Sequence, residues 1–368
     1  MSDFKPGLEG VVAFETEIAE PDRDGGALRY RGVDIEELVG SVPFEQVWGL
    51  LVDESPEPGL PPSERYVARD LTARTPADLQ TVTARLGGEW GCGQLIDISD
   101  DEAKEDLRRL SSVMISICAQ SARLADGETG RVDSDRIATG ATTAERFLLE
   151  WRGEAEPSHA RAIDTYWICT AEHGLNASTF TARIVASTGA DCATALSSAV
   201  GALSGPLHGG APARVLPMLD RAAAADDVDR FVVELLDSGE RLMGFGHRIY
   251  RAEDPRARLL RQTAKELGSP RFEVAEQLEN AALAELHRRK PNRVLATNVE
   301  FWSAVVLDVA DIPPQLAPAM FACSRTAGWS AHILEQKRLG RLVRPSARYV
   351  GPAARSLDEL SAAAPSAT

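Results

Sequence analysis

The stretch GFGHRIYRAEDPR, residues 244–256, carries the most specific pattern in this chain of 368 residues. Gly244 and Gly246 bracket the approach to His247, and glycine lets a backbone come close to a ligand. Three arginines follow within ten residues of this histidine: Arg248, Arg251 and Arg256. The pattern favours a loop that binds an anion; on its own, it would also suit surface arginines beside a turn.

Two further histidines lie in glycine-rich or polar settings. His173 occurs in AEHGLNAST (171–179), and His208 occurs in GPLHGGAP (205–212). The two glycines after His208 permit backbone conformations that other residues avoid and leave room for a ligand. An incidental histidine at a helix-ending glycine turn is an equally good interpretation of this segment alone.

A glutamate precedes a long apolar run in NVEFWSAVVLDVADIPP (298–314). An acid at this position usually stabilises the start of a helix through the helix dipole. In a dry site the carboxylate of Glu300 could instead act as a base with a raised pKa.

The segment FACSRTAGWSAHILEQKRLGRLVRPSARYVGP (321–352) places Arg325 among small residues and Arg344 before a proline. Arginine packs poorly among such residues but binds carboxylates with two parallel hydrogen bonds. His332, in the same segment, is expected in the core or in an interface.

Hydrophobic spacing predicts a mostly or wholly α-helical protein. Apolar residues recur at helical intervals over 228–239 and 272–290, and the run 193–203 is apolar on nearly all sides, as in a buried helix. The only clear strand signal is a small hairpin formed by 11–18 and 27–32 around the turn-rich PDRDGG.

Composition excludes several classes of function. The net charge of −15 is a poor match for nucleic acid or anionic lipid, and no apolar run is long enough to span a bilayer. The five cysteines are scattered along the sequence and include no CxxC pair, which indicates a cytoplasmic protein with reduced thiols. The histidines lack metal-ligand spacing, so we predict no metal, and the glycines do not suit a dinucleotide-binding fold.

These clusters together resemble the citrate synthase family. GPLHGG, GFGHRIYRAEDPR and SRTAGW…RP occur in the family's order, and GLEGVVAFETEI…GGALRYRGVDIEEL is similar to its N-terminal segment, so the resemblance covers about residues 7–352. It implies an all-α fold with a large domain (1–209 and 312–368) and an inserted small domain (210–311). It also implies a homodimer and a site in the cleft between the domains.

The resemblance further assigns roles residue by residue. It implies that His208 stabilises the enol of an acyl-CoA, that His247 polarises the ketone of oxaloacetate, and that Glu300 is the base. His173, Arg256, Arg325 and Arg344 match positions that bind oxaloacetate and citrate, with Arg344 reaching into the partner subunit's site. Gly244, Gly246 and Arg251 are expected near the CoA substrate, and neither a metal nor another cofactor is expected.

The sequence departs from the family at one decisive position, because Glu300 stands where the family normally has aspartate. The expected reaction is that of citrate synthase in the tricarboxylic acid cycle, which joins acetyl-CoA to oxaloacetate. 2-Methylcitrate synthase uses propionyl-CoA with the same machinery and remains open, since one methylene changes discrimination by only about 1–3 kcal/mol. A non-catalytic relative that binds CoA or a dicarboxylate is a further alternative.

Overall fold

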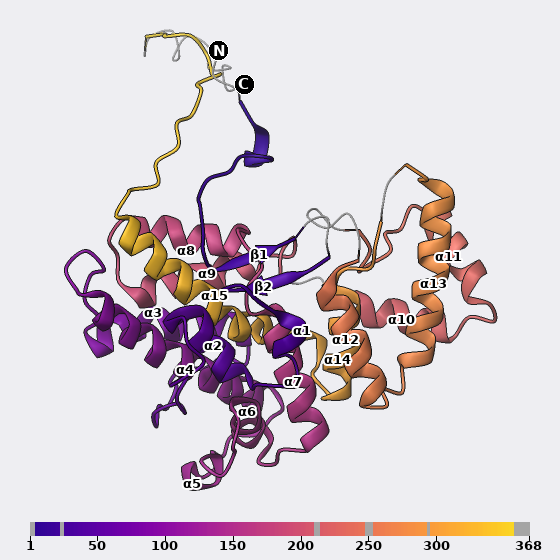
Figure 1. The fold of residues 1–368 in the computed structure, drawn as a ribbon, viewed down its shortest axis with the longest axis horizontal. Helices are drawn as coiled ribbons and strands as arrows, with labels where there is room; N and C mark the ends of the chain where they lie inside the picture. Colours follow the sequence, from indigo (N-terminus) through magenta and orange to yellow (C-terminus); the bar gives the residue numbers. More distant parts are fainter. Residues whose placement is uncertain (1–3, 23–25, 210–213, 247–252, 293–294, 357–368) are drawn as a thin grey trace, which may run out of the picture.

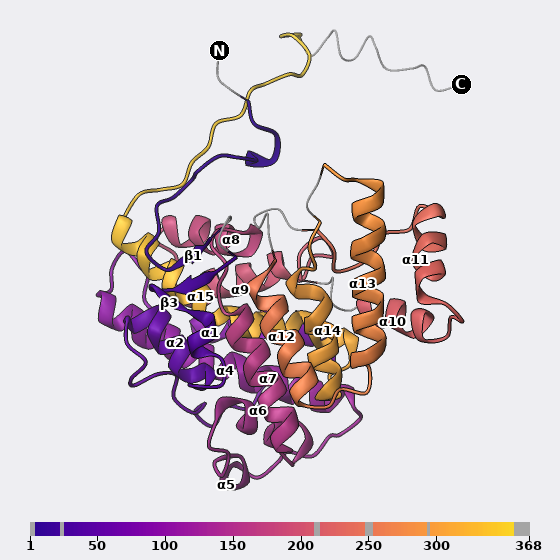
Figure 2. The same ribbon diagram turned by 45° about the vertical axis from the view of Figure 1, so that its right-hand side comes forward.

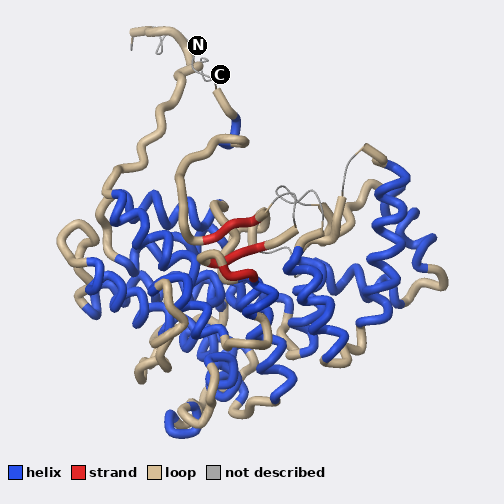
Figure 3. The backbone as a smooth tube through the Cα atoms, in the orientation of Figure 1, coloured by secondary structure: helices blue, strands red, loops and turns tan. Residues whose placement is uncertain are grey.

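The computed structural model describes residues 4–22, 26–209, 214–246, 253–292 and 295–356. Helices dominate these residues, and the only sheet among them has three short strands, so the expected all-α class is confirmed (Figure 3). Helices pack in two groups, a larger one on the left of Figure 1 and a smaller one on the right.

The larger group surrounds a central helix near the C-terminus. Its members are α1 (Ile35–Leu38), α2 (Phe44–Asp53), α3 (Thr75–Trp90), α4 (Asp100–Ala125), α5 (Ser134–Ile137), α6 (Thr143–Arg152), α7 (Pro157–Thr170), α8 (Ala177–Ser187), α9 (Cys192–Leu203) and α15 (Ala317–Leu339). Helix α15 packs against α2, α4, α7, α8 and α9, and it is buried on nearly every side between Ala317 and Gln336. Polar residues on α15 therefore face other helices rather than water.

The smaller group contains α10 (Val215–Ala223), α11 (Val228–Asp237), α12 (Pro255–Glu266), α13 (Phe272–Arg289) and α14 (Val299–Val309). Helix α13 packs against α10 and α11, whereas α12 and α14 pack on each other and on α7 of the larger group (Figure 2). Both helices expected here from spacing are confirmed, and α11 begins at an N-cap in which Asp227 accepts from the Arg230 amide at 3.0 Å.

The expected hairpin is present, but its first strand lies further along the chain. Strand β1 (Ala19–Pro21) pairs antiparallel with β2 (Leu28–Tyr30), and β3 (Val33–Asp34) extends the sheet. The prediction of a strand over 11–18 was therefore wrong in position. The hairpin still matters for the site, because the buried Tyr30 hydroxyl donates to the carbonyl oxygens of Ile168 and Glu172 at 3.0 and 3.1 Å.

The two ends of the described chain run together away from the helical body (Figures 1 and 2). A short 3-10 turn, η1 (Pro6–Leu8), lies in the first segment, and another, η3 (Pro314–Leu316), precedes α15. The N-terminal and C-terminal segments both expose large apolar side chains: Phe4, Val12, Tyr349 and Val350. Among the described residues, no helix combines the length and the apolar character needed to cross a membrane.

Candidate active site

His208 follows α9 and contacts the first turn of α8. Its Nε2 lies 2.9 Å from Ser178 Oγ and accepts the Ser178 backbone N–H at 3.4 Å. Because an N–H can only donate, Nε2 must be unprotonated, and the proton of a neutral imidazole lies on Nδ1. Burial, aided by the nearby charge of Arg325, lowers the pKa of His208 to about 4. At neutral pH the side chain is therefore a neutral donor at Nδ1.

Arg325 is buried in the middle of α15. Its Nε donates to the Thr170 carbonyl oxygen at 2.7 Å, and its guanidinium lies over the Phe321 ring. One terminal nitrogen, NH1, is buried and has no hydrogen-bond partner among the described residues. Burial lowers the pKa of Arg325; Glu172 opposes this, and Arg256 adds to it. A buried guanidinium with unused donors is suited to a carboxylate ligand.

Arg256 lies in the first turn of α12 and is joined to the start of α14. Its Nε and NH2 donate to the Asp254 carboxylate at 3.0 and 2.7 Å, and both side chains are buried. The same carboxylate accepts the Val299 amide at 3.1 Å. Asp254 therefore connects this arginine to the residue directly before Glu300.

Glu300 occupies the first turn of α14. Asn298 caps this helix by accepting the Glu300 amide at 3.0 Å, and its side chain donates to the Gly246 carbonyl oxygen at 3.1 Å. Burial raises the pKa of the Glu300 carboxyl; Arg256 opposes this effect and Asp254 adds to it. A raised pKa makes a carboxylate a stronger base, so the environment suits proton abstraction.

Gly244 and Gly246 support this helix start directly. Gly244 has φ +86°, and a Cβ at this position would lie 2.6 Å from the Phe301 Cβ. Its carbonyl oxygen accepts the Asn298 amide at 2.9 Å, while the Gly246 amide donates to the Ala296 carbonyl oxygen at 2.8 Å. Close packing against α14 explains Gly244, whereas Gly246 has φ +91°, a conformation that favours glycine, and its amide is not free to face a ligand. A contact of either glycine with CoA remains a proposal.

His173 lies in the turn between α7 and α8 and is buried, next to the fully buried Glu172. His247 and Arg251 lie outside the described residues. Arg344 is exposed in the extended segment after α15. The charge of Arg256 acts on Glu300 and repels that of Arg325, and the charge of Arg325 acts on His208, so these four groups influence one another's pKa.

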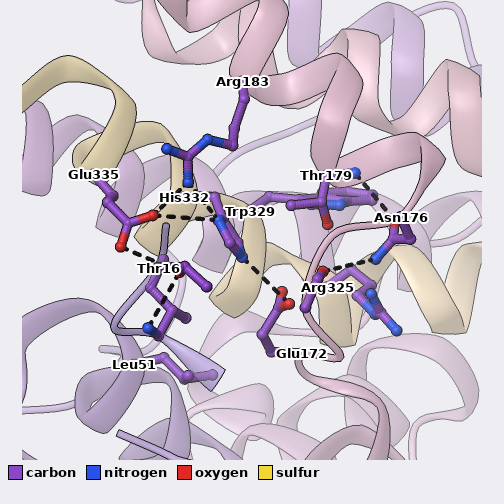
Figure 4. A network of polar contacts seen from close by, with 12 residues as sticks. Thr16, Leu51, Glu172, Asn176, Thr179, Arg183, Arg325, Trp329, His332 and Glu335 are labelled. Atoms are coloured by element: carbon purple, nitrogen blue, oxygen red, sulfur yellow. Dashed lines mark hydrogen bonds and ion pairs between the residues drawn. The ribbon is translucent and has the colours of Figure 1, made fainter. Parts of the chain in front are cut away.

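The sequence reasoning did not predict a buried polar network, which is formed by Thr16, Glu172, Arg183, His332 and Glu335 (Figure 4). Arg183 NH1 donates to His332 Nδ1 at 3.0 Å, so the His332 proton lies on Nε2, which is 3.3 Å from Glu172 Oε1. Arg183 also pairs with Glu335, which in turn accepts from the Thr16 hydroxyl. His332 is buried, as expected; the signal for the rest was the spacing of three to four residues between polar groups along α15.

Glu172 lies at one end of this network, where its carboxylate contacts His332. Burial alone would raise the pKa of its carboxyl, but His332 and Arg325 more than offset burial and hold that pKa below its usual value. Helix α15 approaches so closely that a Cβ on Gly328 would lie 2.0 Å from Glu172 Oε2. The carboxylate is therefore a buried counter-charge for Arg325, immediately before His173 in the chain.

Two cavities lie outside the group formed by His208, Arg256, Glu300 and Arg325. One of about 630 Å³ lies between residues 60–71 and helices α4 and α6, and it contains none of the expected site residues. Another of about 480 Å³ borders the loops that lead into α12 and α14, where Glu253, Leu295 and Thr297 line it. Within the described part of the chain, no three metal-binding side chains come together.

The sequence matches a model of the citrate synthase C-terminal domain over residues 7–346. It is 59% identical to a putative citrate synthase 2 of Mycobacterium tuberculosis over 356 residues, covering 96% of this chain and 95% of that protein. It is also 32% identical to a 2-methylcitrate synthase of Shewanella oneidensis, covering 97% of this chain and 98% of the relative.

The fold is similar to that of a solved citrate synthase from Thermoplasma acidophilum, described as a ternary complex with carboxymethyl coenzyme A and oxaloacetate. The TM-score is 0.82 at 26% identity, covering 97% of this chain and 99% of the other. Sequence and fold agree along almost the whole length, and the chain therefore belongs to the citrate synthase family.

Proposed function

We propose that the protein condenses acetyl-CoA with oxaloacetate and then hydrolyses the citryl-CoA thioester to citrate and CoA. One observation carries this proposal: the charge of the buried Arg256 acts on the Glu300 carboxyl, whose pKa is raised, and on the buried Arg325, and the charge of Arg325 acts on the neutral His208. A dicarboxylate that neutralised the arginines would be flanked by a base and by a hydrogen-bond donor.

The first step removes a proton from the methyl group of acetyl-CoA. Glu300 takes that proton, and the Nδ1–H of His208 donates to the thioester oxygen, where negative charge develops. A base on one side and a donor on the other are both required, because a thioester is a weak carbon acid in water. The neutral state of His208 is compatible with this role, since the neutral imidazole retains one N–H donor, on Nδ1.

The second step forms the carbon–carbon bond. The enol carbon attacks the ketone carbon of oxaloacetate, while Arg256, Arg325 and His173 hold the carboxylates, and His247 polarises the ketone oxygen. Water then attacks the thioester carbonyl and releases CoA thiol.

We assign residues 210–311 to a small domain whose closure excludes water during condensation. We place the reaction in the tricarboxylic acid cycle and in the cytoplasm, which is consistent with five free thiols.

Purified protein given acetyl-CoA and oxaloacetate is expected to release free CoA thiol without added metal or nicotinamide cofactor. The similarity to a 2-methylcitrate synthase makes propionyl-CoA the necessary comparison, and an apolar pocket separates the two substrates by about 1–3 kcal/mol. We expect a higher kcat/KM with acetyl-CoA. A higher value with propionyl-CoA would favour 2-methylcitrate synthesis, and loss of activity with a chelator that zinc restores would contradict the metal-free reaction.

We further propose a homodimer in which Arg344 completes the partner subunit's site. In the single chain this arginine is exposed on an extended segment that also exposes the apolar side chains of Tyr349 and Val350. The terminal segments are therefore suited to pack against a second subunit.

Complementation tests this shared site. Arg344→Ala and His247→Ala subunits should each be inactive, because each homodimer lacks one group in both sites. In a re-equilibrated equal mixture, each heterodimer has one intact site, so roughly a quarter of wild-type activity should return. Light scattering should report a dimer, and a fully active monomer would contradict the proposal.

A further inference from the structure

Trp329 reaches the proposed catalytic histidine through one intermediate side chain. It lies four residues after Arg325 on α15, so the two side chains share a helix face. The Trp329 indole is fully buried, and its Nε1–H donates to Ser178 Oγ at 3.2 Å. The same oxygen lies 2.9 Å from His208 Nε2. Trp329, Ser178 and His208 therefore form a continuous line of polar contacts.

The chemistry of an indole constrains the serine between them. An indole N–H can only donate, so Trp329 occupies one lone pair of Ser178 Oγ. The hydroxyl proton must then point away from the indole, toward Asn176 Oδ1 at 2.9 Å or His208 Nε2 at 2.9 Å. The single hydroxyl proton serves one of these two acceptors while the indole N–H occupies a lone pair, and these two hydrogen bonds restrict the rotamer of the serine. The serine amide that binds His208 belongs to the same residue.

We propose that Trp329 is a positioning residue, which orients the His208 imidazole by fixing Ser178. This inference rests on the role proposed above for His208. Trp329 touches no substrate in this scheme; it acts on the ring orientation that directs the Nδ1–H toward the thioester oxygen. Loss of the indole donor frees the Ser178 hydroxyl to rotate and lets His208 sample orientations and tautomers that do not support enol formation.

The test replaces the indole N–H alone. Site-specific incorporation of 3-benzothienylalanine at position 329 exchanges this N–H for sulfur and preserves the size of the ring. We expect kcat to fall roughly tenfold, the scale of one hydrogen bond, while KM for oxaloacetate stays within about twofold. In ring-labelled protein, ¹⁵N spectra of His208 should show a new population with the proton on Nε2.

Trp167 supplies a matched control. It is also fully buried, and its Nε1–H donates to the Met320 carbonyl oxygen at 3.1 Å, a contact that does not involve His208. The same analogue at position 167 should lower stability to a similar degree and leave kcat unchanged. Equal kcat losses at the two positions would overturn the inference, as would a rise in the KM for oxaloacetate as large as the fall in kcat.

A double-mutant cycle identifies the intermediate. Because Trp329 acts through Ser178, the analogue at 329 should have no further effect on kcat in a Ser178→Ala background. Additive losses would overturn the inference. His208→Asn separates the two claims: an active variant would refute the proposed role of His208 itself. An inactive His208→Asn enzyme, together with an analogue at 329 that behaves like the one at 167, would refute only the role of Trp329.

Discussion

Glu300→Gln is expected to reduce turnover by roughly 10²–10⁴-fold, the usual contribution of a positioned general base. The amide keeps the size of the side chain but cannot accept the proton from the acyl-CoA methyl group. Thiol release from acetyl-CoA and oxaloacetate measures the loss, and equilibrium binding of oxaloacetate should be nearly unchanged. Near-normal turnover of Glu300→Gln would mean that another residue is the base.

The pH profile of the wild-type enzyme provides a second measurement of the same group. Burial raises the pKa of Glu300, so the carboxyl is protonated, and inactive as a base, at a higher pH than an ordinary glutamate. The acid limb of kcat/KM for acetyl-CoA should therefore lie above the usual glutamate pKa of about 4.3. Glu240, an exposed glutamate paired with Arg221, is the matched control, and Glu240→Gln should change neither turnover nor the profile.

Glu300→Asp tests whether the longer side chain is adapted to its surroundings. Glutamate reaches further than aspartate by one carbon–carbon bond of about 1.5 Å. The start of α14 is held by Asn298, Asp254 and Gly244, so the backbone cannot move freely toward a shorter side chain. We expect no gain in turnover from Glu300→Asp. A gain of many-fold would show that Glu300 is a handicap and would favour a non-catalytic binding role.

Arg325→Ala is expected to weaken oxaloacetate binding by about 2–5 kcal/mol, the loss typical of one partner in a desolvated charge pair. The guanidinium is buried, and its NH1 has no hydrogen-bond partner among the described residues. Isothermal titration with oxaloacetate measures the change directly. The far-ultraviolet circular dichroism should stay unchanged, because the surrounding α15 helix is held by apolar packing.

Arg65 supplies the control for this substitution. It is an exposed arginine that forms an ion pair with Asp135 on the surface of the larger helical group. Arg65→Ala removes the same charge from the protein and should leave oxaloacetate affinity unchanged. An equal loss in both variants would indicate a general effect of net charge. Unchanged affinity in Arg325→Ala would show that this arginine does not bind the substrate.

Local sequence was sufficient for the helical class and for several individual elements. The apolar spacing that predicted helices at 228–239 and 272–290 is found in α11 and α13, because a helix in a globular protein must bury one face. The same holds for the run 193–203, which lies within α9. The motifs around His208 and Glu300 were also recognisable locally, since each combines a reactive group with glycine or a helix start within a few residues.

The contacts that give those groups their chemistry come only from the tertiary structure. Asp254 bonds to the Val299 amide 45 positions away, and Trp329 bonds to Ser178 151 positions away. Periodicity reports which face of one element is buried, but it does not say which element covers that face. The pKa of His208 and that of Glu300 depend on burial and on arginines from other helices, so they are determined where the helices pack. The position of the first strand in the hairpin was also decided by tertiary contacts. Hydrogen-bond pairing between β1 and β2, rather than local propensity, determines where the β-ladder begins.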